Sequence, residues 1–412
     1  MNDLFFWIVS IFGLFLSIFW TQVIYMSGPE PVKRKELPSI SIIVPAWNEQ
    51  KALPKTIDSL MVLDYPADKI NVIIVNHGST DNTKQVARNL LRKYKERKIL
   101  LVNIKRKPGQ SKASAMNVGL KYANGEFVGC MDADSVADKE ALLNLIPFFS
   151  GKEVGAVISA IKVTNTKTMW GKLQRLEYLF AQLVRELMSK IDTLHVTPGA
   201  LSLYRLDLIK RLGGFDENSL TEDYEIAMRL RYHGYTIKMA IKSISYTAVP
   251  DTFRGLWKQR VRWFRGFIET AVKYKKMFGN KKFGMMGVFQ YPVNILTFIT
   301  VISGFSIVSY ELFSKGYNLA MELFALKAGV FDVLKMPSWF DILMHVNVNI
   351  LFPMVLSFSI AIYIYHMAHK VSGEKWKYPL ILLIYLFLYP ILRSFHWITA
   401  VYKETFGVSK KW

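Results

Sequence analysis

The chain of 412 residues contains a single cysteine, Cys130. One cysteine cannot form a disulfide within the chain and cannot by itself build a zinc site. It lies in an apolar run, so we expect a buried thiol in a hydrophobic core. The sequence also lacks internal repeats and low-complexity tracts, which excludes a repeat architecture.

Charged residues are absent from several long stretches of the chain. Residues 4–26 carry no charge and would reach about 35 Å as a helix, enough to cross a bilayer core. They lack the basic start and the small-residue cleavage site of a signal peptide. Three later stretches are Phe283–Tyr310, Ile342–His369 and Tyr378–Tyr402, the last interrupted by Arg393. We therefore predict four membrane helices, one before and three after a polar middle.

Acidic residues are few, with 32 Asp and Glu against 53 Lys and Arg and a formal net charge of +21. Nucleic-acid binding is one explanation of such a charge. Positive residues beside membrane helices, together with affinity for anionic lipids and diphosphates, explain it more simply. Basic clusters follow the first apolar stretch, at Pro31–Lys35, and precede the second, at Lys273–Lys282.

These clusters predict an integral protein of the cell membrane with a cytoplasmic middle and no nucleic-acid partner. The first helix then runs from outside to inside, and three further crossings leave the C-terminus outside. Lys403, Lys410 and Lys411 favour the opposite side, so the side of the C-terminus stays open.

Apolar runs alternate with helical patterns between residues 40 and 134. The predicted strands are Ile40–Val44, Ile70–Val75, Ile99–Ile104 and Glu126–Met131, and the predicted helices are Glu49–Leu60, Thr83–Lys95 and Ala113–Tyr122. Ser79 or Thr80 is a candidate N-cap for the second of these helices. Such units predict a parallel sheet with helices on both faces, which binds ligands beyond the carboxyl ends of its strands.

Three later segments have helical patterns of different kinds. Trp170–Leu194 carries an apolar stripe that is typical of packing. Arg254–Phe278 is basic and aromatic, which predicts an amphipathic helix on the membrane surface. Leu319–Leu334 is too charged to span a membrane, which indicates an interfacial or external helix. The predicted domains are a membrane helix (1–27), a cytosolic domain (28–253), an interface helix (254–282) and a three-helix membrane region (283–412).

Two carboxylates, Asp132 and Asp134, follow the fourth predicted strand. Residues two apart in extended chain face the same side, where their charges repel unless a cation answers them. Mg²⁺ prefers one or two carboxylates with phosphate oxygens and water, although a helix cap beside a loop aspartate would give the same pattern. Lys112 lies where a Gly-containing loop enters a helix, which favours phosphate binding, or else a solvated basic loop.

A third group of carboxylates lies in the segment Thr221-Glu222-Asp223. A partly buried carboxylate can remove the proton from an incoming hydroxyl. Thr221 can also begin a capping box for the helical pattern at Tyr224–Tyr232, and both interpretations can hold together.

Gln259, Arg262 and Trp263 lie on one helical face by their spacing. Arginine can brace a diphosphate, and tryptophan can stack on a sugar ring. Anchoring of the helix among lipid head groups is the alternative, above all for Trp263.

In the order of these motifs the chain resembles the membrane-integrated family 2 glycosyltransferases. That group includes cellulose, chitin, hyaluronan and poly-N-acetylglucosamine synthases and chitooligosaccharide synthases. The resemblance covers residues 40–265 and the membrane layout. It implies an α/β GT-A, Rossmann-like domain with an α-helical transmembrane region, inversion by direct displacement, and Mg²⁺ or Mn²⁺ as cofactor.

The resemblance also implies roles for individual residues. Asp134 would bind the metal together with Asp132, which would also contact the nucleotide. Asp223 would be the general base, with Glu222 beside it in the catalytic segment. The remaining expected residues are Pro45, Asn48, Glu49, Asn76 and His77 for the nucleotide, Lys112 for the diphosphate, and Gln259, Arg262, Trp263 and Gly199 for the diphosphate and acceptor.

One departure from the family pattern concerns the nucleobase. The family usually has two acids before Gly78-Ser79-Thr80-Asp81, and one of them reads the base. Here Asn76 and His77 occupy those positions. Asparagine can still hydrogen-bond a pyrimidine edge, so a UDP-sugar is favoured and a guanosine donor such as GDP-mannose stays open.

The sequence thus predicts a processive transferase that extends a β-linked polysaccharide at the cytoplasmic face. The alternative is transfer of a single sugar to a polyprenyl phosphate or another lipid. A non-catalytic receptor and a transporter are weaker alternatives, the latter based on Arg393 and His396. The expected partners are a nucleotide-sugar donor, a glycan or lipid acceptor, membrane lipids, and either a second copy or an export subunit.

Overall fold

The computed structural model describes residues 2–32, 34, 36–107, 109–326, 338, 347–375 and 378–410. Internal packing divides the chain into two units. A helical unit contains the residues up to Tyr25 and Val293–Met367, and an α/β unit contains Met26–Pro292 and the residues from Ala368 onward. The residues from Ala368 onward, which the sequence analysis assigned to the membrane region, group with the α/β unit in this division.

An eight-stranded sheet with the order β3-β2-β1-β4-β7-β6-β8-β5 forms the centre of the α/β unit. The strands are β1 (Ile40–Ala46), β2 (Ile70–His77), β3 (Lys98–Ile104), β4 (Phe127–Cys130), β5 (Ser135–Ala137), β6 (Val154–Val163), β7 (Ser202–Arg205) and β8 (Thr236–Thr247). The first four strands are parallel, as predicted. The remaining half is mixed, because β7 runs antiparallel to β4 and β6 while β8 is parallel to β6.

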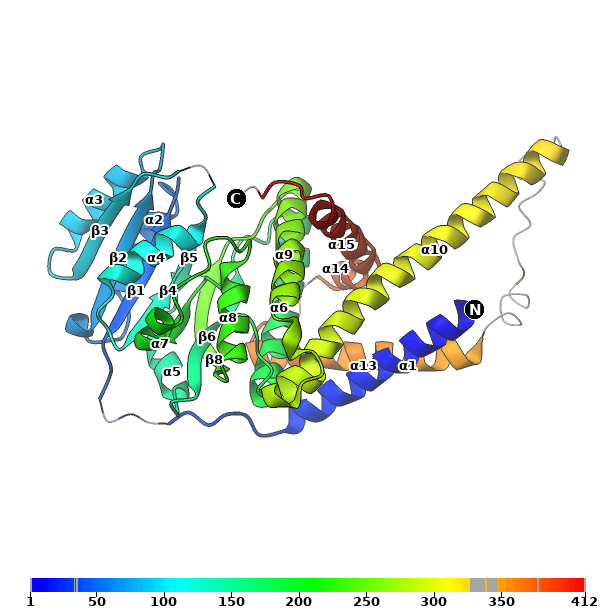
Figure 1. Ribbon diagram of the computed structural model, residues 1–412, viewed down its shortest axis with the longest axis horizontal. Helices are drawn as coiled ribbons and strands as arrows, with labels where there is room; N and C mark the ends of the chain where they lie inside the picture. Colours follow the sequence, from blue (N-terminus) through cyan, green and yellow to red (C-terminus); the bar gives the residue numbers. More distant parts are fainter. Residues whose placement is uncertain are drawn as a thin grey trace. The chain divides into compact units, whose positions relative to one another are not determined.

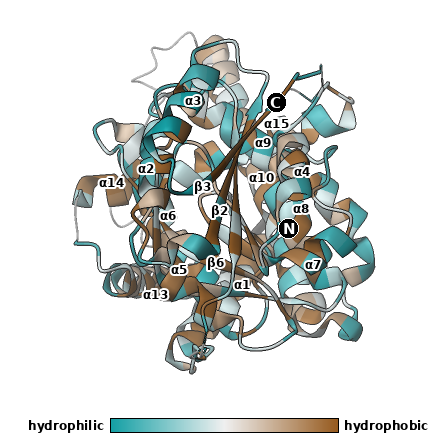
Figure 2. Ribbon diagram, turned by 90° about the vertical axis from the view of Figure 1, so that its left-hand side faces the viewer, coloured by the Kyte–Doolittle hydropathy of each residue, from teal (hydrophilic) through white to brown (hydrophobic). Residues whose placement is uncertain are grey.

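Helices cover both faces of the sheet (Figure 1). They are α2 (Leu53–Met61), α3 (Thr83–Lys93), α4 (Lys112–Tyr122), α5 (Ala141–Leu145), α6 (Met169–Lys190), α7 (Leu206–Arg211), α8 (Glu222–Tyr232) and α9 (Phe253–Lys273). Alternate residues of β1 face opposite sides, so Ile42 packs with α2, α3 and α5 while Ile43 packs with α4, α7 and α8. Figure 2 shows the mainly hydrophobic strands at the centre and hydrophilic residues on α3. Cys130 is buried in this core, as predicted.

The C-terminal segment of the α/β unit contains α14 (Pro379–Leu383), a π-helical turn and α15 (Tyr389–Thr405). Helix α15 lies along α9 (Figure 1). The ring of Trp397 on α15 stacks on Phe264 of α9 with 4.0 Å between centroids. The apolar side of α9, which the sequence assigned to the membrane surface, is therefore in part covered by α15.

The helical unit contains α1 (Asn2–Tyr25), most of α10 (Tyr291–Leu326) and most of α13 (Val348–Ser372). Among the described residues, four segments are long and apolar enough to cross a membrane, in agreement with the predicted number: Leu4–Tyr25, Met286–Ala325, Val348–Ser372 and Pro379–Thr405. Of the predicted helix Leu319–Leu334, residues up to Leu326 continue α10 and the rest lie outside the described residues. Residues 342–346 of the third apolar stretch, and Lys33, Lys35 and Lys411, also lie outside them.

Candidate active site

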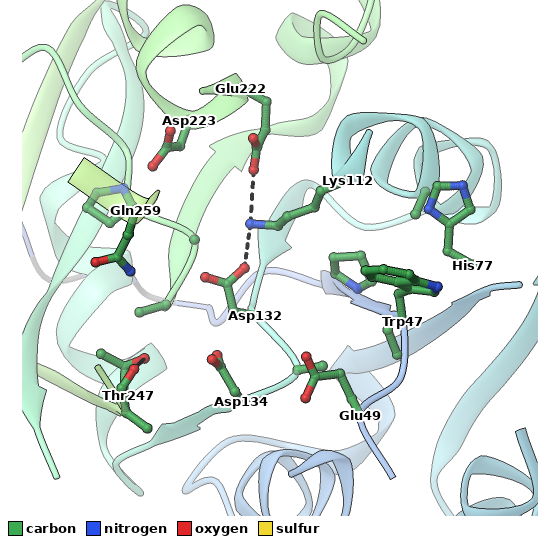
Figure 3. A pocket seen from close by; sticks show the side chains of 18 of the residues that line it. Trp47, Glu49, His77, Lys112, Asp132, Asp134, Glu222, Asp223, Thr247 and Gln259 are labelled. Carbon is green, nitrogen blue, oxygen red and sulfur yellow. Dashed lines mark hydrogen bonds and ion pairs between the residues drawn. The ribbon is translucent and has the colours of Figure 1, made fainter. Parts of the chain in front are cut away.

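A cavity of about 390 Å³ opens beyond the carboxyl ends of β1, β2 and β4, where the sequence predicted a ligand site. Side chains from α4, α6, α8 and α9 complete its walls (Figure 3). Twelve of the fourteen predicted site residues line it: Pro45, Glu49, His77, Lys112, Asp132, Asp134, Gly199, Glu222, Asp223, Gln259, Arg262 and Trp263. The other two, Asn48 and Asn76, do not.

Lys112, the first residue of α4, lies between two carboxylates of the cavity (Figure 3). Its Nζ forms ion pairs with Asp132 and, at 2.9 Å, with Glu222 Oε1. Burial lowers the pKa of Lys112, but the charges of these two acids outweigh burial and hold the pKa well above its ordinary value. Lys112 is therefore a fixed positive charge that joins the end of β4 to the start of α8.

Gly199 makes room for this ion pair. A Cβ atom at this position would lie 2.6 Å from both Asp132 carboxylate oxygens and from Lys112 Nζ. The Gly199 carbonyl also accepts a hydrogen bond from the Asp132 backbone N–H at 2.8 Å. Any larger residue would displace the charged groups, which explains a glycine at the position expected for the acceptor loop.

Glu222 and Asp223 are neighbours with opposite pKa shifts. Burial raises the pKa of Glu222, but Lys112 and Arg262 outweigh burial, so the net pKa lies below its ordinary value. Burial and the charge of Glu222 raise the pKa of Asp223 to about 6. The pKa values of these two neighbouring acids are thus shifted apart, and Asp223 is the one of the pair able to exchange a proton near neutral pH.

Hydrogen bonds fix the main chain at Asp223. Its backbone carbonyl accepts from Thr197 Oγ1 at 2.7 Å, and its Oδ1 accepts from the Tyr224 backbone N–H at 2.8 Å. Thr221 is the N-cap residue of α8, but its side chain makes no capping bond and lies against Gly266 of α9. The capping box considered from the sequence is therefore not formed.

Asp134 and Glu49 face the cavity near Asp132 (Figure 3). Burial and the charge of Asp132 raise the pKa of Asp134 to about 6. Burial and the charges of Asp134 and Asp132 raise the pKa of Glu49 to about 7. In this part of the cavity the negative charge of the carboxylates therefore exceeds the positive charge of the neighbouring side chains.

The same carboxylates fit a divalent cation. Among the described residues, no group of three or more His, Cys, Asp or Glu side chains is arranged to hold a metal by itself. Mg²⁺ and Mn²⁺ at nucleotide sites complete their shells with phosphate oxygens and water, so they need only one or two carboxylates. Asp134 and Asp132 supply such oxygens, and a cation between them would reverse the repulsion that raises the pKa of Asp134.

Gln259, Arg262 and Trp263, which the sequence analysis placed on one helical face, lie on α9 and all three line the cavity. Arg262 Nη1 donates to the Leu220 carbonyl at 3.1 Å, next to the start of α8. This contact holds a guanidinium group beside the acidic segment, where it can meet an anionic ligand.

Arg260, within the same motif, is 1% exposed and holds its two neighbours in place. Its guanidinium lies 4.2 Å from the ring centroid of Trp263 and donates to Gln259 Oε1. It also pairs with Glu177 of α6, which accepts from Tyr389 Oη at 2.9 Å. The motif is thus supported by α6 and by the C-terminal helical segment.

The two asparagines outside the lining shape the nearby loops instead. Asn48 has a positive φ of 60°, and its Oδ1 accepts from the Thr80 backbone N–H at 2.8 Å. Asn76 donates to Asn103 Oδ1 at 2.9 Å and is 4% exposed. The predicted N-caps Ser79 and Thr80 take part in these loop contacts, and the N-cap of α3 is Asn82.

His77 and two residues missed by the sequence analysis form the other end of the cavity. Burial lowers the pKa of His77, and its Nε2 lies 3.3 Å from Gln110 Oε1. The Arg106 guanidinium stacks 3.8 Å above the ring centroid of Trp47. The sequence offered one signal for each residue of this pair. Trp47 is an aromatic residue directly after β1, and Arg106 is a basic residue shortly after β3.

Tyr178 and Thr247 also line the cavity and were not predicted. Tyr178 lies within the helical pattern of α6, where it is hidden among core residues. Thr247 ends β8, a strand that the sequence analysis did not recognise. Neither position carried a sequence signal of its own.

This fold and this cavity define a GT-A glycosyltransferase domain. Residues 38–266 match the family model described as "Glycosyltransferase like family 2", which covers more than half of the chain. The chain therefore belongs to glycosyltransferase family 2.

Several curated relatives are synthases of one polysaccharide. Poly-beta-1,6-N-acetyl-D-glucosamine synthase of Staphylococcus aureus (strain COL) is 29% identical over 313 residues, 73% of this chain and 72% of that protein. The synthase of the same name from Staphylococcus epidermidis is 26% identical over 395 residues, 92% of this chain and 89% of that protein.

Among solved structures, a mannosyltransferase (PcManGT) from Pyrobaculum calidifontis, in complex with GDP-Man and Mn²⁺, is similar over 97% of each chain. The TM-score is 0.66 and the sequence identity is 19%. At this identity the similarity supports the shared fold only.

The raised pKa of Glu49 predicts a pH-dependent cost in stability. A carboxyl whose pKa rises from 4.5 to about 7 on folding destabilises the folded state as pH increases through that range. Glu49→Gln removes this cost. In EDTA, the variant should melt higher than wild type at pH 8 and nearly equally at pH 5. Solvent screens the partly exposed carboxyl, so the cost in the free energy of unfolding at pH 8 is about 1 kcal/mol. This corresponds to a difference in melting temperature of roughly 2–4 °C between variant and wild type.

Thermal unfolding of the detergent-purified chain measures this effect. Glu96→Gln, at an exposed position on the same unit, is the matched control and should show no pH-dependent gain. A Glu49→Gln variant that melts at or below the wild-type temperature at pH 8 would contradict the repulsion among these carboxylates.

Proposed function

We propose that the chain is an inverting, metal-dependent transferase that adds sugars from a nucleotide-sugar donor to a growing β-linked polysaccharide. The observation that carries this proposal is one cavity in which Asp223 faces the Asp132–Asp134 pair and the α9 motif. A base, a metal-diphosphate site and a sugar platform are the parts that direct displacement requires.

In the proposed reaction, Asp223 accepts the proton of an acceptor hydroxyl as that oxygen attacks the anomeric carbon of the donor. The bond from the anomeric carbon to the diphosphate breaks at the same time, and the diphosphate leaves with the electron pair. Attack opposite the leaving group inverts the configuration. Asp223 suits this role because its pKa of about 6 keeps it ionised at neutral pH and still basic.

The leaving diphosphate needs positive charge. Arg262 and Lys112 contribute it from two walls of the cavity. A Mg²⁺ or Mn²⁺ ion held by Asp134 and Asp132 would neutralise further charge on the diphosphate when bound. Trp263, fixed by Arg260, would offer a face on which the acceptor sugar stacks.

Glu222 takes a supporting role in this scheme. Its ion pair with Lys112 and its lowered pKa make it a weak base at neutral pH. We assign it to holding Lys112, and through Lys112 to placing Asp132, and leave the proton transfer to Asp223 alone.

The donor we favour is UDP-N-acetylglucosamine, because the curated relatives are poly-beta-1,6-N-acetyl-D-glucosamine synthases over most of their length. The Arg106–Trp47 stack and His77 lie where the nucleotide would enter, and they give the base an aromatic face and neutral polar groups. The side chains of Asn48 and Asn76 bond to Thr80 and Asn103. We therefore assign these two asparagines to holding the loops around the nucleotide end of the cavity.

A donor panel tests the proposed function directly. Purified protein with Mg²⁺ or Mn²⁺ is given UDP-glucose, UDP-N-acetylglucosamine, UDP-glucuronate or GDP-mannose, and released nucleotide and product size are measured. We expect release from UDP-N-acetylglucosamine with a polymeric, non-lipid product. A single-sugar product that partitions into organic solvent would instead identify a lipid glycosyltransferase.

Replacement of the proposed base separates binding from turnover. Asp223→Asn should lower kcat by about 10²–10⁴-fold with little change in UDP affinity, because an amide cannot accept the proton. In the wild type, kcat should fall as pH drops through about 6, where Asp223 becomes protonated. Asp64→Asn, at an exposed position, is the control. A kcat of Asp223→Asn equal to that of the wild type would show that Asp223 is not the base.

Metal dependence has its own signature at Asp134. EDTA should stop transfer, and Mn²⁺ should restore it. Asp134→Asn should raise the Mn²⁺ concentration for half-maximal rate by about 10-fold or more, since one carboxylate ligand is lost. Titration at saturating donor measures this shift, with Asp138→Asn as a nearby control. Transfer that persists in EDTA would refute the metal site.

A further inference from the structure

The last apolar segment, Pro379–Thr405, has 27 residues, about 40 Å as a helix. Length and composition alone make it a fourth membrane crossing. Its contacts, however, lie along the α/β unit from one end to the other, and they decide its orientation.

The N-terminal end of the segment packs on α6 and α9. Ile381 and Ile384 contact a buried cluster formed by Leu173, Leu256 and Tyr389. Tyr389 is 2% exposed and donates a hydrogen bond to Glu177 of α6.

The middle of the segment lies on α9. His396 is fully buried, with its ring 4.6 Å from that of Trp257, and Trp397 stacks on Phe264. The guanidinium of Arg393 lies 5.9 Å from the Phe264 ring centroid. With His396 and Ala400 fully buried, this face of α15 packs against the α/β unit.

The C-terminal end also returns to the α/β unit. Arg265 of α9 pairs with Glu404 and donates to the Val408 carbonyl at 2.8 Å. Lys410 pairs with Glu269 and donates to the carbonyl of Asn218 at 3.1 Å. Asn218 lies four residues before Glu222, so the tail reaches the loop that leads into the candidate active site.

Helix α9 cannot accompany α15 through a bilayer. It carries six basic residues: Arg254, Lys258, Arg260, Arg262, Arg265 and Lys273. Charged side chains in the hydrocarbon core are strongly unfavourable, and Arg262 lines a polar cavity with five carboxylates. Since α15 lies along α9, a crossing by α15 would place this charge inside the membrane.

The outward face of the segment is a continuous apolar stripe. Exposed apolar side chains recur mostly at spacings of three, four and seven residues, and the last of them lies just beyond the segment: Leu380, Leu383, Phe387, Leu388, Ile391, Phe395, Tyr402 and Phe406. The stripe begins at Leu380, eight residues after α13 ends at Ser372, and α13 is itself apolar enough to cross a membrane. A helix with one lipid-facing stripe and one packed face is typical of the membrane interface.

We propose that Pro379–Thr405 lies in the plane of the membrane interface, with this stripe inserted into the leaflet on the side of the α/β unit. The chain then crosses the membrane three times, at α1, α10 and α13. The C-terminus lies on the same side as the candidate active site, in contrast to the outside position expected from four crossings.

Depth measurements test the orientation of the segment. Single cysteines at Leu380, Ile391 and Tyr402 are labelled with bimane in protein reconstituted in vesicles, and lipids brominated at different depths quench the label. Cys130 is 2% exposed and the unsubstituted protein serves as the blank. We expect one shallow depth at all three positions. A deep Ile391 between two shallow ends, or no quenching by lipid at any position, would overturn the proposal.

Cysteines on α13 provide the matched control. Leu351, Val355 and Ile362 are exposed apolar positions on that helix. Their labels should lie at clearly different depths, because a crossing helix passes through every layer of the bilayer. This confirms that the method resolves depth in the same protein.

The side of the C-terminus gives an independent readout. Ser409→Cys, Lys84→Cys on α3 and Asn347→Cys before α13 are exposed to an impermeant maleimide in vesicles of both orientations. Ser409→Cys should react in the same vesicles as Lys84→Cys and not in those that expose Asn347→Cys. Reaction together with Asn347→Cys would show a fourth crossing and refute the in-plane helix, whatever the enzymatic activity is.

Discussion

The ion pairs of Lys112 with Asp132 and Glu222 are the interaction on which the cavity depends. Five carboxylates face this space, and their mutual repulsion would open it without a positive charge among them. Lys112 joins the end of β4 to the start of α8, two elements that are far apart in sequence. Because it lowers the pKa of Glu222, Asp223 is the member of this neighbouring pair of acids whose pKa of about 6 lies near neutral pH.

Two glycines make room for the groups around Lys112. Gly199 leaves no Cβ beside the ion pair, and Gly266 lets α9 approach Thr221 at the start of α8. Arg262 then reaches the carbonyl of Leu220 and adds its charge to the same wall. Small residues at two close approaches therefore determine how near the basic helix can come to the acidic segment.

The parallel half of the sheet was predictable because its strands are short, mainly apolar runs, and β1, β2 and β4 are buried almost throughout. The mixed half was not. Strand β8 carries Lys238 and Lys242 among its apolar residues, so its periodicity did not stand out. Helix α2 begins at Leu53, four residues later than predicted, because the turn at Asn48 adopts a positive φ. Turns of this kind depend on contacts with a distant loop.

Most of the candidate site could be predicted because its residues follow strands or share a helix face, which are properties of local sequence. The side chains of the two exceptions bond to other parts of the protein, Asn48 to the Thr80 backbone and Asn76 to Asn103. No sequence pattern distinguishes an amide that meets a ligand from one that makes such a contact. Trp47 and Arg106 were missed because their proximity depends on the tertiary fold. They come from different strand ends, and only the sheet brings them within 3.8 Å.

Hydropathy measures how apolar a segment is but not which of its faces meets protein. Pro379–Thr405 satisfies the criterion for crossing, yet one of its faces packs on α9 through His396 and Trp397. Through Tyr389 and Glu177 the same segment supports Arg260, which fixes Trp263 in the cavity. The position of the proposed acceptor platform is thus coupled to a helix whose other face is apolar.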